Sequence, residues 1–408
     1  MPGFIFNRYL SVGLNFLKNS YLFFELNANE FGYLFLLVAI RDIGSHLLFG
    51  SRFYLLKNYS SSNKKISSTF LKINKITAVV AFPVCFICLY LYFKNIQSVI
   101  ISLYLIHIQQ ISTICHCIWN AKKETEKIAK IEVIIAIVSV LLILGLNEYL
   151  LDLYLSSMIS IVLSPLIYIP AFYSLKIPKL SRYDRIDISA NELFRYYRID
   201  NLINTPLMLI KLIYPVLFGN SHYGIFSFTF SIANNLSFLI GGKLYYHAKQ
   251  IIDQFNGLAL NIDDIKLLEK TMIYESFVNF IVLLFLGALV LHLSDLLPKS
   301  LNPTEFILIL CLFYLKFNNT RMRAFCFRQL SNIYDRTIII GLSCILVWIV
   351  FGIGFDLFND STYLISSLII FQLIVSFRCT HVFLLHNPTF RPFFMALDMV
   401  PLCLLLLL

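Results

Sequence analysis

The sequence predicts an all-α polytopic membrane protein with about 12 transmembrane helices, and three observations support this fold class. Of its 408 residues, 58% are hydrophobic and only 14% are charged, whereas soluble domains carry about 25% charged residues. The apolar residues form runs of about 20, which is the length that crosses the hydrocarbon core of a bilayer. Basic residues crowd every second loop between these runs. A soluble fold could not bury so much apolar surface, so the solvent must be lipid.

Taken in order, the apolar runs give twelve predicted spans joined by short loops. They are 4–26, 31–54, 76–93, 98–120, 131–147, 150–174, 193–218, 222–246, 271–293, 304–326, 337–357 and 362–386. The first run has no cleavage site after it and is predicted to be a retained span. A thirteenth run, 393–408, either spans, lies at the interface or is cut off.

The distribution of basic residues predicts the orientation. Eighteen lysines and arginines lie in the loops after spans 2, 4, 6, 8 and 10, against two, Lys94 and Lys299, in the alternate loops. Positive charge in short loops marks the cytoplasmic side. The N-terminus and the segment after span 12 are therefore predicted to be cytoplasmic. Because the net charge of +10 resides in these loops, it does not indicate a nucleic-acid partner.

The loops on the opposite side are very short, for example Asn27–Glu30 and Gly219–His222. They leave no room for an external domain, which disfavours membrane glycosyltransferases, polymerases and ligases. The cysteine motifs Cys85–Cys88 and Cys115–Cys117 have spacings that redox or metal sites use. We interpret them as small hydrophobic residues of the core, because buried cysteine usually acts in that way. No metal or catalytic residue is predicted.

A shift of 192 residues places Phe31–Tyr54 over Tyr223–Tyr246, with six of 24 positions identical. Two of the identical pairs are glycines, which are needed where helix backbones approach closely. The shift equates span 1 with span 7, so both halves would enter the membrane in the same direction, as in parallel-repeat transporters. We therefore predict two pseudo-symmetric six-helix lobes around a central cavity. The predicted boundaries are 1–175 for the N-terminal lobe, 176–192 for a cytoplasmic linker, 193–386 for the C-terminal lobe and 387–408 for an apolar tail.

Charged side chains within the predicted spans are costly in a bilayer and usually face a cavity or a partner. Arg8, Ser11, Asn15 and Lys18 recur at spacings that place them on one face of span 1. The basic residues predicted to form a cationic, substrate-binding cavity are Arg8, Lys18, Arg41, Lys211, Lys316 and Arg321. Such a cavity would attract an anion such as a pyrophosphate. As alternatives, Arg8 and Arg321 snorkel to the interface, and Arg41 only neutralises its neighbours.

Three further residues are candidates for ion coupling: Asp42, His46 and Glu275. A buried carboxylate or imidazole can carry a proton through a transport cycle, whereas structural pairing is the alternative role. The sequence leaves open whether a proton, sodium or no ion drives the cycle. Pro206, in the middle of span 7, is predicted to kink the helix, either as part of a gate or as a static bend.

Three short segments resemble polysaccharide exporters, which include the O-antigen flippases. The segment Glu25–Tyr33 looks like the start of span 2 in that family, His222–Phe228 looks like its counterpart in span 8, and Ala129–Ile131 enters span 5 after a basic loop. The family belongs to the multidrug/oligosaccharidyl-lipid/polysaccharide (MOP) superfamily, whose overall pattern covers nearly the whole chain. Because span 1 begins almost at Met1, the N-terminus is slightly short for the family, and the apolar run at the C-terminus is atypical of it or truncated.

The resemblance implies a flippase that moves undecaprenyl-pyrophosphate-linked oligosaccharide from the cytoplasmic to the periplasmic leaflet of the bacterial inner membrane. It also implies a cationic central cavity, and the expected partners are the lipid-linked substrate, membrane lipids, a polysaccharide polymerase and a chain-length regulator, with no cofactor. A small-molecule or drug antiporter of the same fold is one alternative. A glycan polymerase or ligase is another, and the short external loops argue against it.

Overall fold

The computed structural model of the 408-residue chain is helical at almost every described position and contains no strand in the described residues. The described residues are 2–48, 68–122, 124–149, 152–175, 210–231, 303–312 and 361–386, with the isolated positions 191, 194, 208, 277–278, 281, 285, 288, 343, 346, 350 and 352. The chain divides into two compact units, Met1–Pro215 and Val216–Leu408. Each unit is described by itself.

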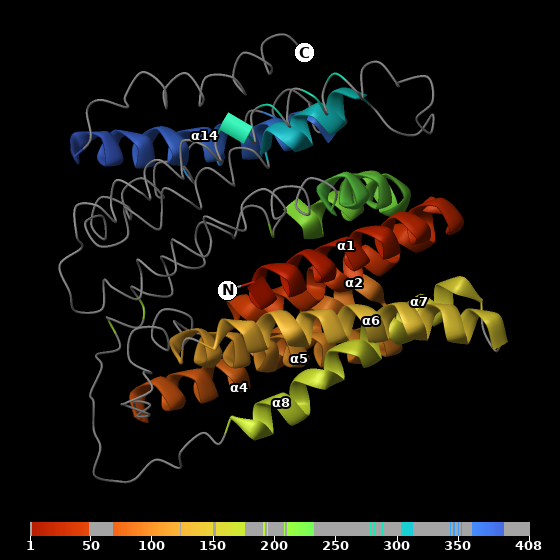
Figure 1. Ribbon diagram of the computed structural model, residues 1–408. Helices are drawn as coiled ribbons and strands as arrows, with labels where there is room; N and C mark the ends of the chain where they lie inside the picture. The colour runs from red at the N-terminus through yellow and green to blue at the C-terminus, as the bar shows by residue number, and fades with distance from the viewer. Residues whose placement is uncertain are drawn as a thin grey trace. The chain divides into compact units, whose positions relative to one another are not determined.

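The first unit contains helices at all six spans predicted for the N-terminal half (Figure 1). They are α1 (Pro2–Glu25), α2 (Ala28–His46), α4 (Ser68–Phe93), α5 (Ile96–Ala121), α6 (Thr125–Tyr149), α7 (Leu153–Leu163) and α8 (Tyr168–Ser174), with a 3-10 turn, η1 (Ser164–Ile167), between the last two. Among the described residues, four helical segments are long and apolar enough to cross a membrane: Lys72–Phe93, Ile96–Asn120, Thr125–Tyr149 and Leu153–Ser174.

Helices α1 and α2 are less apolar because they carry the charges that the sequence places inside the membrane. Their 24 and 19 residues correspond to lengths of about 36 and 28 Å at a rise of about 1.5 Å per residue. Both lengths match the hydrocarbon core of about 30 Å. Their polar side chains therefore need partners on neighbouring helices rather than contact with lipid.

The turn between α1 and α2 is closed by a capping box. The Asn27 side chain accepts a hydrogen bond from the backbone N–H of Glu30 at 2.9 Å, and the Glu30 carboxylate accepts one from the backbone N–H of Asn27 at 3.4 Å. This reciprocal pair satisfies two N–H groups that a helix start leaves without partners. The sequence around Asn27 therefore fixes a tight reversal, as the short predicted loop requires.

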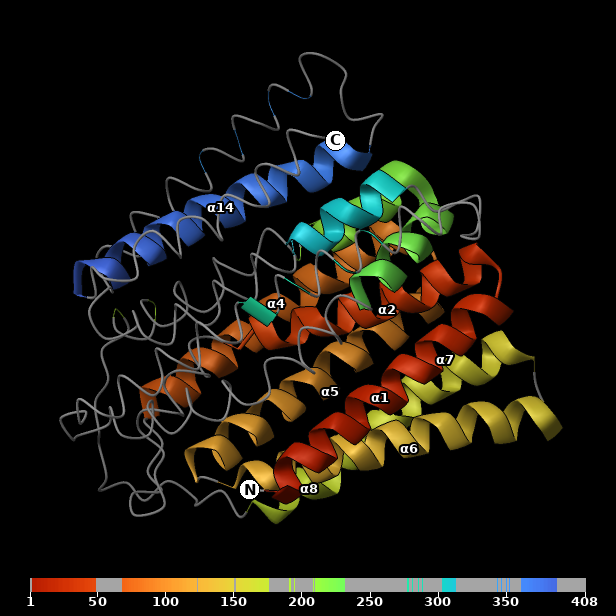
Figure 2. The ribbon, with the colours of Figure 1, turned by 45° about the horizontal axis from the view of Figure 1, so that its top comes forward.

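Helix α1 runs parallel to α6, and Figure 2 shows the two side by side. Gly3, near the start of α1, lies against Glu126 at the start of α6. Further along both helices, the Lys18 Nζ donates to the Ser139 Oγ at 3.2 Å. A chain that reverses at each crossing has its first and fifth spans in the same direction, so this packing agrees with six alternating crossings.

Helix α2 runs parallel to α5 in the same way, as second and fourth spans must. The Tyr33 and Ser98 hydroxyls are 2.8 Å apart near the starts of the two helices. Later in both helices, a Cβ built on Gly44 would lie 2.2 Å from the carbonyl oxygen of Ile106. Only glycine permits this approach of the two backbones.

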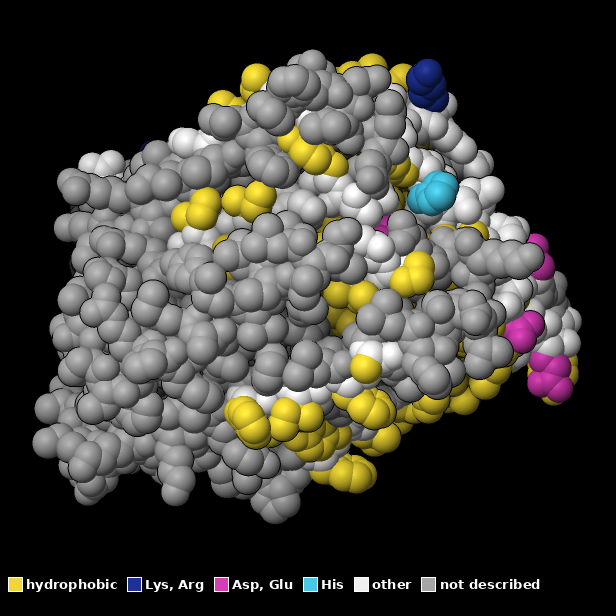
Figure 3. Space-filling model, turned by 90° about the horizontal axis from the view of Figure 1, so that it is seen from above, with side chains coloured by type: hydrophobic (Ala, Val, Ile, Leu, Met, Phe, Trp, Pro, Cys, Tyr) yellow, Lys and Arg dark blue, Asp and Glu magenta, His cyan; other side chains and the backbone are white. Residues whose placement is uncertain are grey.

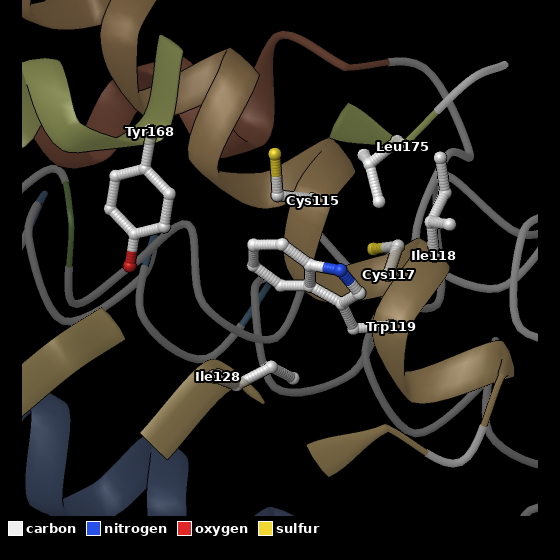
Figure 4. Packing of buried hydrophobic residues seen from close by; sticks show 7 residues of the cluster. All are labelled: Cys115, Cys117, Ile118, Trp119, Ile128, Tyr168 and Leu175. Carbon is white, nitrogen blue, oxygen red and sulfur yellow. The ribbon is translucent and has the colours of Figure 1, made fainter. Parts of the chain in front are cut away.

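A hydrophobic cluster joins α5, α6 and α8 at one end of the unit. Its buried members are Cys115, Cys117, Ile118, Trp119, Ile128, Tyr168 and Leu175 (Figure 4). Within the described part of the chain, no group of three or more His, Cys, Asp or Glu residues could hold a metal ion. Cys115 and Cys117 are both buried in this cluster, and their role as small hydrophobic residues stays an interpretation.

The outer surface of the unit is apolar. Helix α4 is exposed along most of its length, with Val79 66% and Leu91 68% exposed. Figure 3 shows one face of the whole chain, with hydrophobic side chains at several places on the described surface and acidic side chains along its right edge. A helix that is apolar and uncovered in this way is suited to contact with lipid chains.

Fewer residues of the second unit are described. Helix α14 (Ser361–His386) coincides with the twelfth predicted span, and residues 303–312 are helical within the tenth. In the helical residues 210–231, Gly219 has a φ of 80° at the start of the predicted loop. The predicted tail 387–408 and nearly all of the predicted linker 176–192 lie outside the described residues.

Two equated pairs of the predicted repeat are alike in burial. Phe31 and Tyr223, which the 192-residue shift equates, are both helical and almost fully buried. Gly32 and Gly224 are buried as well. The later part of the second copy, from residue 232 on, lies outside the described residues, so the repeat and the lobe boundaries stay predictions.

Candidate substrate-binding site

The polar stripe predicted along α1 is present. The Asn15 Nδ2 donates to the backbone carbonyl of Ser11 at 3.0 Å, and the Lys18 Nζ donates to the Asn15 Oδ1 at 3.2 Å. These contacts link positions three and four residues apart, which share one face of a helix. The stripe faces α6, so α1 turns its polar side into the unit.

Lys18 is held by a chain of hydroxyls from two other helices. The Lys18 Nζ donates to the Ser139 Oγ of α6, which lies 2.7 Å from the Ser160 Oγ of α7. The Ser160 Oγ donates in turn to the backbone carbonyl of Ser139 at 3.0 Å. Each hydroxyl therefore donates once and accepts once, which leaves Ser139 free to accept from the ammonium group.

No carboxylate contacts Lys18 among the residues that the structure describes; its hydrogen-bond partners are a neutral amide and a neutral hydroxyl. The Arg41 guanidinium of α2 is near enough to repel the Lys18 ammonium group. A cation with neutral partners and a cationic neighbour is expensive inside a membrane. This arrangement favours an anion as a further ligand.

Arg41, Asp42 and Lys211 form the second part of the site. The Asp42 Oδ1 lies 3.6 Å from the Arg41 Nη2, and its Oδ2 lies 3.8 Å from the Lys211 Nζ. Lys211 also interacts with the Arg41 charge. We refer to Lys18, Arg41, Asp42 and Lys211 as the Arg41 cluster. It brings together three of the six cations predicted for the cavity and one of the three candidates for ion coupling.

Arg8, a fourth predicted cavity residue, forms an ion pair with Glu132 of α6. Glu132 is not among the predicted site residues, because it lies only one residue inside the predicted start of span 5, where carboxylates are common. Helix α6 in fact begins at Thr125, so Glu132 lies two turns inside it. A carboxylate two turns inside a membrane helix needs a partner, so its depth would have indicated a cation on a neighbouring helix.

We expect the Arg8–Glu132 pair to be a structural contact. Glu132→Gln should lower the free energy of unfolding by about 2 kcal/mol, because it leaves Arg8 with less compensation inside the unit. The exchanged pair Arg8→Glu with Glu132→Arg should recover most of that loss. Thermal unfolding of the purified full chain, as a double-mutant cycle, measures both values. Equal stability of Glu132→Gln and the parent protein would contradict the expectation.

A third polar contact lies beside the hydrophobic cluster. The His116 Nε2 is 2.8 Å from the Tyr168 hydroxyl, with the two rings in an edge-to-face arrangement at 5.4 Å. Ser112 also hydrogen-bonds the Tyr168 side chain. In the sequence, His116 lies between the two cysteines of the Cys115–Cys117 motif. The structure gives it a hydrogen-bond role that joins α5 to α8.

Of the other predicted site residues, the structure describes only His46. His46 is the last residue of α2, at the end of the helix beyond Arg41 and Asp42. Outside the described residues lie Pro206, Glu275, Lys316 and Arg321. Their roles as gate, coupling residue and cavity lining stay predictions.

No family model and no curated protein matches the chain. Solved structures do match it over nearly its whole length. The structure of MATE in the bent conformation aligns with a TM-score of 0.52 at 11% identity, covering 97% of this chain and 95% of that chain. An outward-facing multidrug resistance MATE family transporter of the MOP superfamily aligns with a TM-score of 0.51 at 11% identity, covering 98% and 96%.

A third structure is a MOP superfamily transporter from Pyrococcus furiosus, described by a reverse polarity of its binding pocket. It aligns with a TM-score of 0.51 at 11% identity, covering 97% of this chain and 96% of that chain. The chain has the fold of the MOP superfamily transporters. This confirms the predicted all-α polytopic membrane class. At such identities the likeness concerns the fold alone, because one fold can support different functions.

Proposed function

We propose that the protein is a flippase for a lipid-linked oligosaccharide whose headgroup is a pyrophosphate. Three features support the proposal: the MOP transporter fold, the resemblance of short segments to polysaccharide exporters, and the charge of the Arg41 cluster. The observation that carries it is the placement of Lys18 beside Arg41, with only neutral hydrogen-bond partners for Lys18 among the described residues.

A phosphate-bearing headgroup fits the donors of this cluster. Arg41 offers a planar fork of N–H groups that suits two phosphate oxygens, and Lys18 offers a compact point charge. The described residues of α1, α2, α6 and 210–215 that form the site and its neighbouring ion pair include four cations and two carboxylates. The excess, four minus two, is positive. The ligand that such a site selects is an anion.

The drug-antiporter alternative shares the same fold, and the comparisons do not separate the two. A cationic drug would need carboxylates that are free to face it, whereas Asp42 and Glu132 are each bound to arginine or lysine. In the proposed cycle the lobes alternate access, so that the headgroup crosses from the cytoplasmic to the opposite leaflet of a bacterial inner membrane. The coupling ion is a proton, sodium or none.

The proposal is tested with the full chain in liposomes. The probe is a polyprenyl pyrophosphate that carries a short glycan labelled with a dithionite-sensitive fluorophore. We expect the protein to move the inner-leaflet label outward, so that dithionite bleaches nearly all of the signal rather than about half. A parallel measurement of ethidium uptake tests the antiporter. Ethidium transport without movement of the lipid probe would overturn the proposal in favour of the drug antiporter.

A further inference from the structure

The two carboxylate oxygens of Asp42 face two different cations, one on α2 and one in residues 210–215. One oxygen lies 3.6 Å from Arg41 and the other 3.8 Å from Lys211. Hydrogen bonds between fully engaged charged groups are about 2.7–2.9 Å long. The carboxylate therefore supplies counter-charge to both cations without a close hydrogen bond to either.

Arg41 retains a donor that Asp42 does not use. Its Nε is buried and has no hydrogen-bond partner among the described residues, although a buried N–H normally finds one. The Arg41 and Asp42 side chains are 28% and 36% exposed, so parts of both can be reached. An oxyanion that reaches the Arg41 guanidinium would compete with Asp42 for it, and it would bind the Nε once the Arg41 side chain turns toward it.

We infer that Asp42 is an internal competitor of the headgroup: its carboxylate holds Arg41 and Lys211 when the site is empty, yields them to the pyrophosphate, and takes them back as the headgroup leaves. The inference rests on the proposed function and adds a role for one residue. Without Asp42, the empty cluster would contain like charges only. With Asp42, the cations stay in place, and the incoming anion is repelled by one negative charge.

The charge of the ligand determines how strongly Asp42 repels it. Coulomb repulsion scales with the product of the charges, so Asp42 weakens the binding of a doubly charged pyrophosphate diester more than that of a singly charged phosphate diester. It thereby limits the affinity for the pyrophosphate and favours its release. Asp42 is in this sense a positioning residue that also tunes specificity.

Asp42→Asn tests the inference in the full chain, embedded in nanodiscs. The probes are the labelled polyprenyl pyrophosphate glycan and its monophosphate counterpart. We expect Asp42→Asn to bind the pyrophosphate probe about tenfold more tightly than the parent protein does. Its gain in affinity for the monophosphate probe should be smaller. In liposomes, the same variant should show a lower KM and a lower kcat for flipping. Asp42→Glu, which keeps the charge, should retain the parent ratio of affinities for the two probes.

A second variant keeps the test decisive if Asp42→Asn aggregates. Lys211→Gln removes one of the two cations that Asp42 holds, and it should weaken pyrophosphate binding more than monophosphate binding. Unchanged or weaker pyrophosphate binding by a monodisperse Asp42→Asn would overturn the inference and leave the flippase proposal standing. Equal weakening of both probes in Lys211→Gln would do the same. Failure of the parent protein to bind or flip either probe would overturn both.

Discussion

Arg41→Ala should slow flipping of the pyrophosphate-linked probe by about 30-fold, and Lys18→Ala should have a similar effect. Each substitution removes a charged hydrogen bond to the headgroup, which is worth about 2 kcal/mol. Neither substitution breaks a close ion pair of the described fold. Arg41 pairs with Asp42 only at 3.6 Å, and Lys18 hydrogen-bonds a serine hydroxyl. Fluorescence loss in the liposome assay measures the rate, and size-exclusion chromatography checks that the variants insert and remain monodisperse.

Lys130→Ala is the matched control for these variants. Lys130 is also a helical lysine, but it pairs with Glu126 at 3.1 Å while its side chain is 60% exposed. Exposed pairs of this kind contribute little to stability, so Lys130→Ala should flip the probe at the parent rate. Parent rates in both Lys18→Ala and Arg41→Ala would remove the Arg41 cluster from the transport pathway.

Gly44→Leu should destabilise the protein strongly. Even the first atom of a side chain at this position would lie 2.2 Å from the Ile106 carbonyl and 2.9 Å from the Gln109 Cβ. Because the nearest of these atoms is backbone, α2 must move away from α5. Overpacking costs about 1–3 kcal/mol in a core, and here the displaced helix also carries Arg41 and Asp42. Thermal unfolding in detergent should show a clear drop in Tm, with loss of flipping.

Gly13→Ala is the control for that experiment, because nothing lies within 4 Å of a Cβ built on Gly13. Alanine at an unhindered helical position is neutral or stabilises by about 0.5–1 kcal/mol. We therefore expect its Tm to equal or slightly exceed that of the parent. If Gly44→Leu unfolds at the same temperature as Gly13→Ala, the close contact of α2 with α5 is wrong.

The first-half helices and the α1 stripe could be predicted from sequence because their signals are local. Runs of apolar residues located the helices, and the spacing from Ser11 to Lys18 placed the polar side chains on one face. The helix starts were less accurate: α6 begins at Thr125, six residues before the predicted start of span 5. Charged residues at a helix start extend the helix beyond the apolar run that marks it.

Contacts between helices could not be predicted in the same way. Glu132 and Ser139 become partners of α1 only because α6 lies parallel to it. Gly44 has no local signal at all, since its importance comes from the Ile106 backbone on another helix. The sixth span was predicted as one helix, yet Pro165 gives it a 3-10 turn at its centre, because proline removes a backbone donor.

The most direct measurement is a density map of the full chain in a nanodisc with the polyprenyl pyrophosphate probe bound. The proposed mechanism predicts phosphate density within hydrogen-bonding distance of the Lys18 ammonium and the Arg41 guanidinium, with Asp42 moved away from Arg41. Phosphate density at another place, with Lys18 and Arg41 packed against lipid chains, would contradict it.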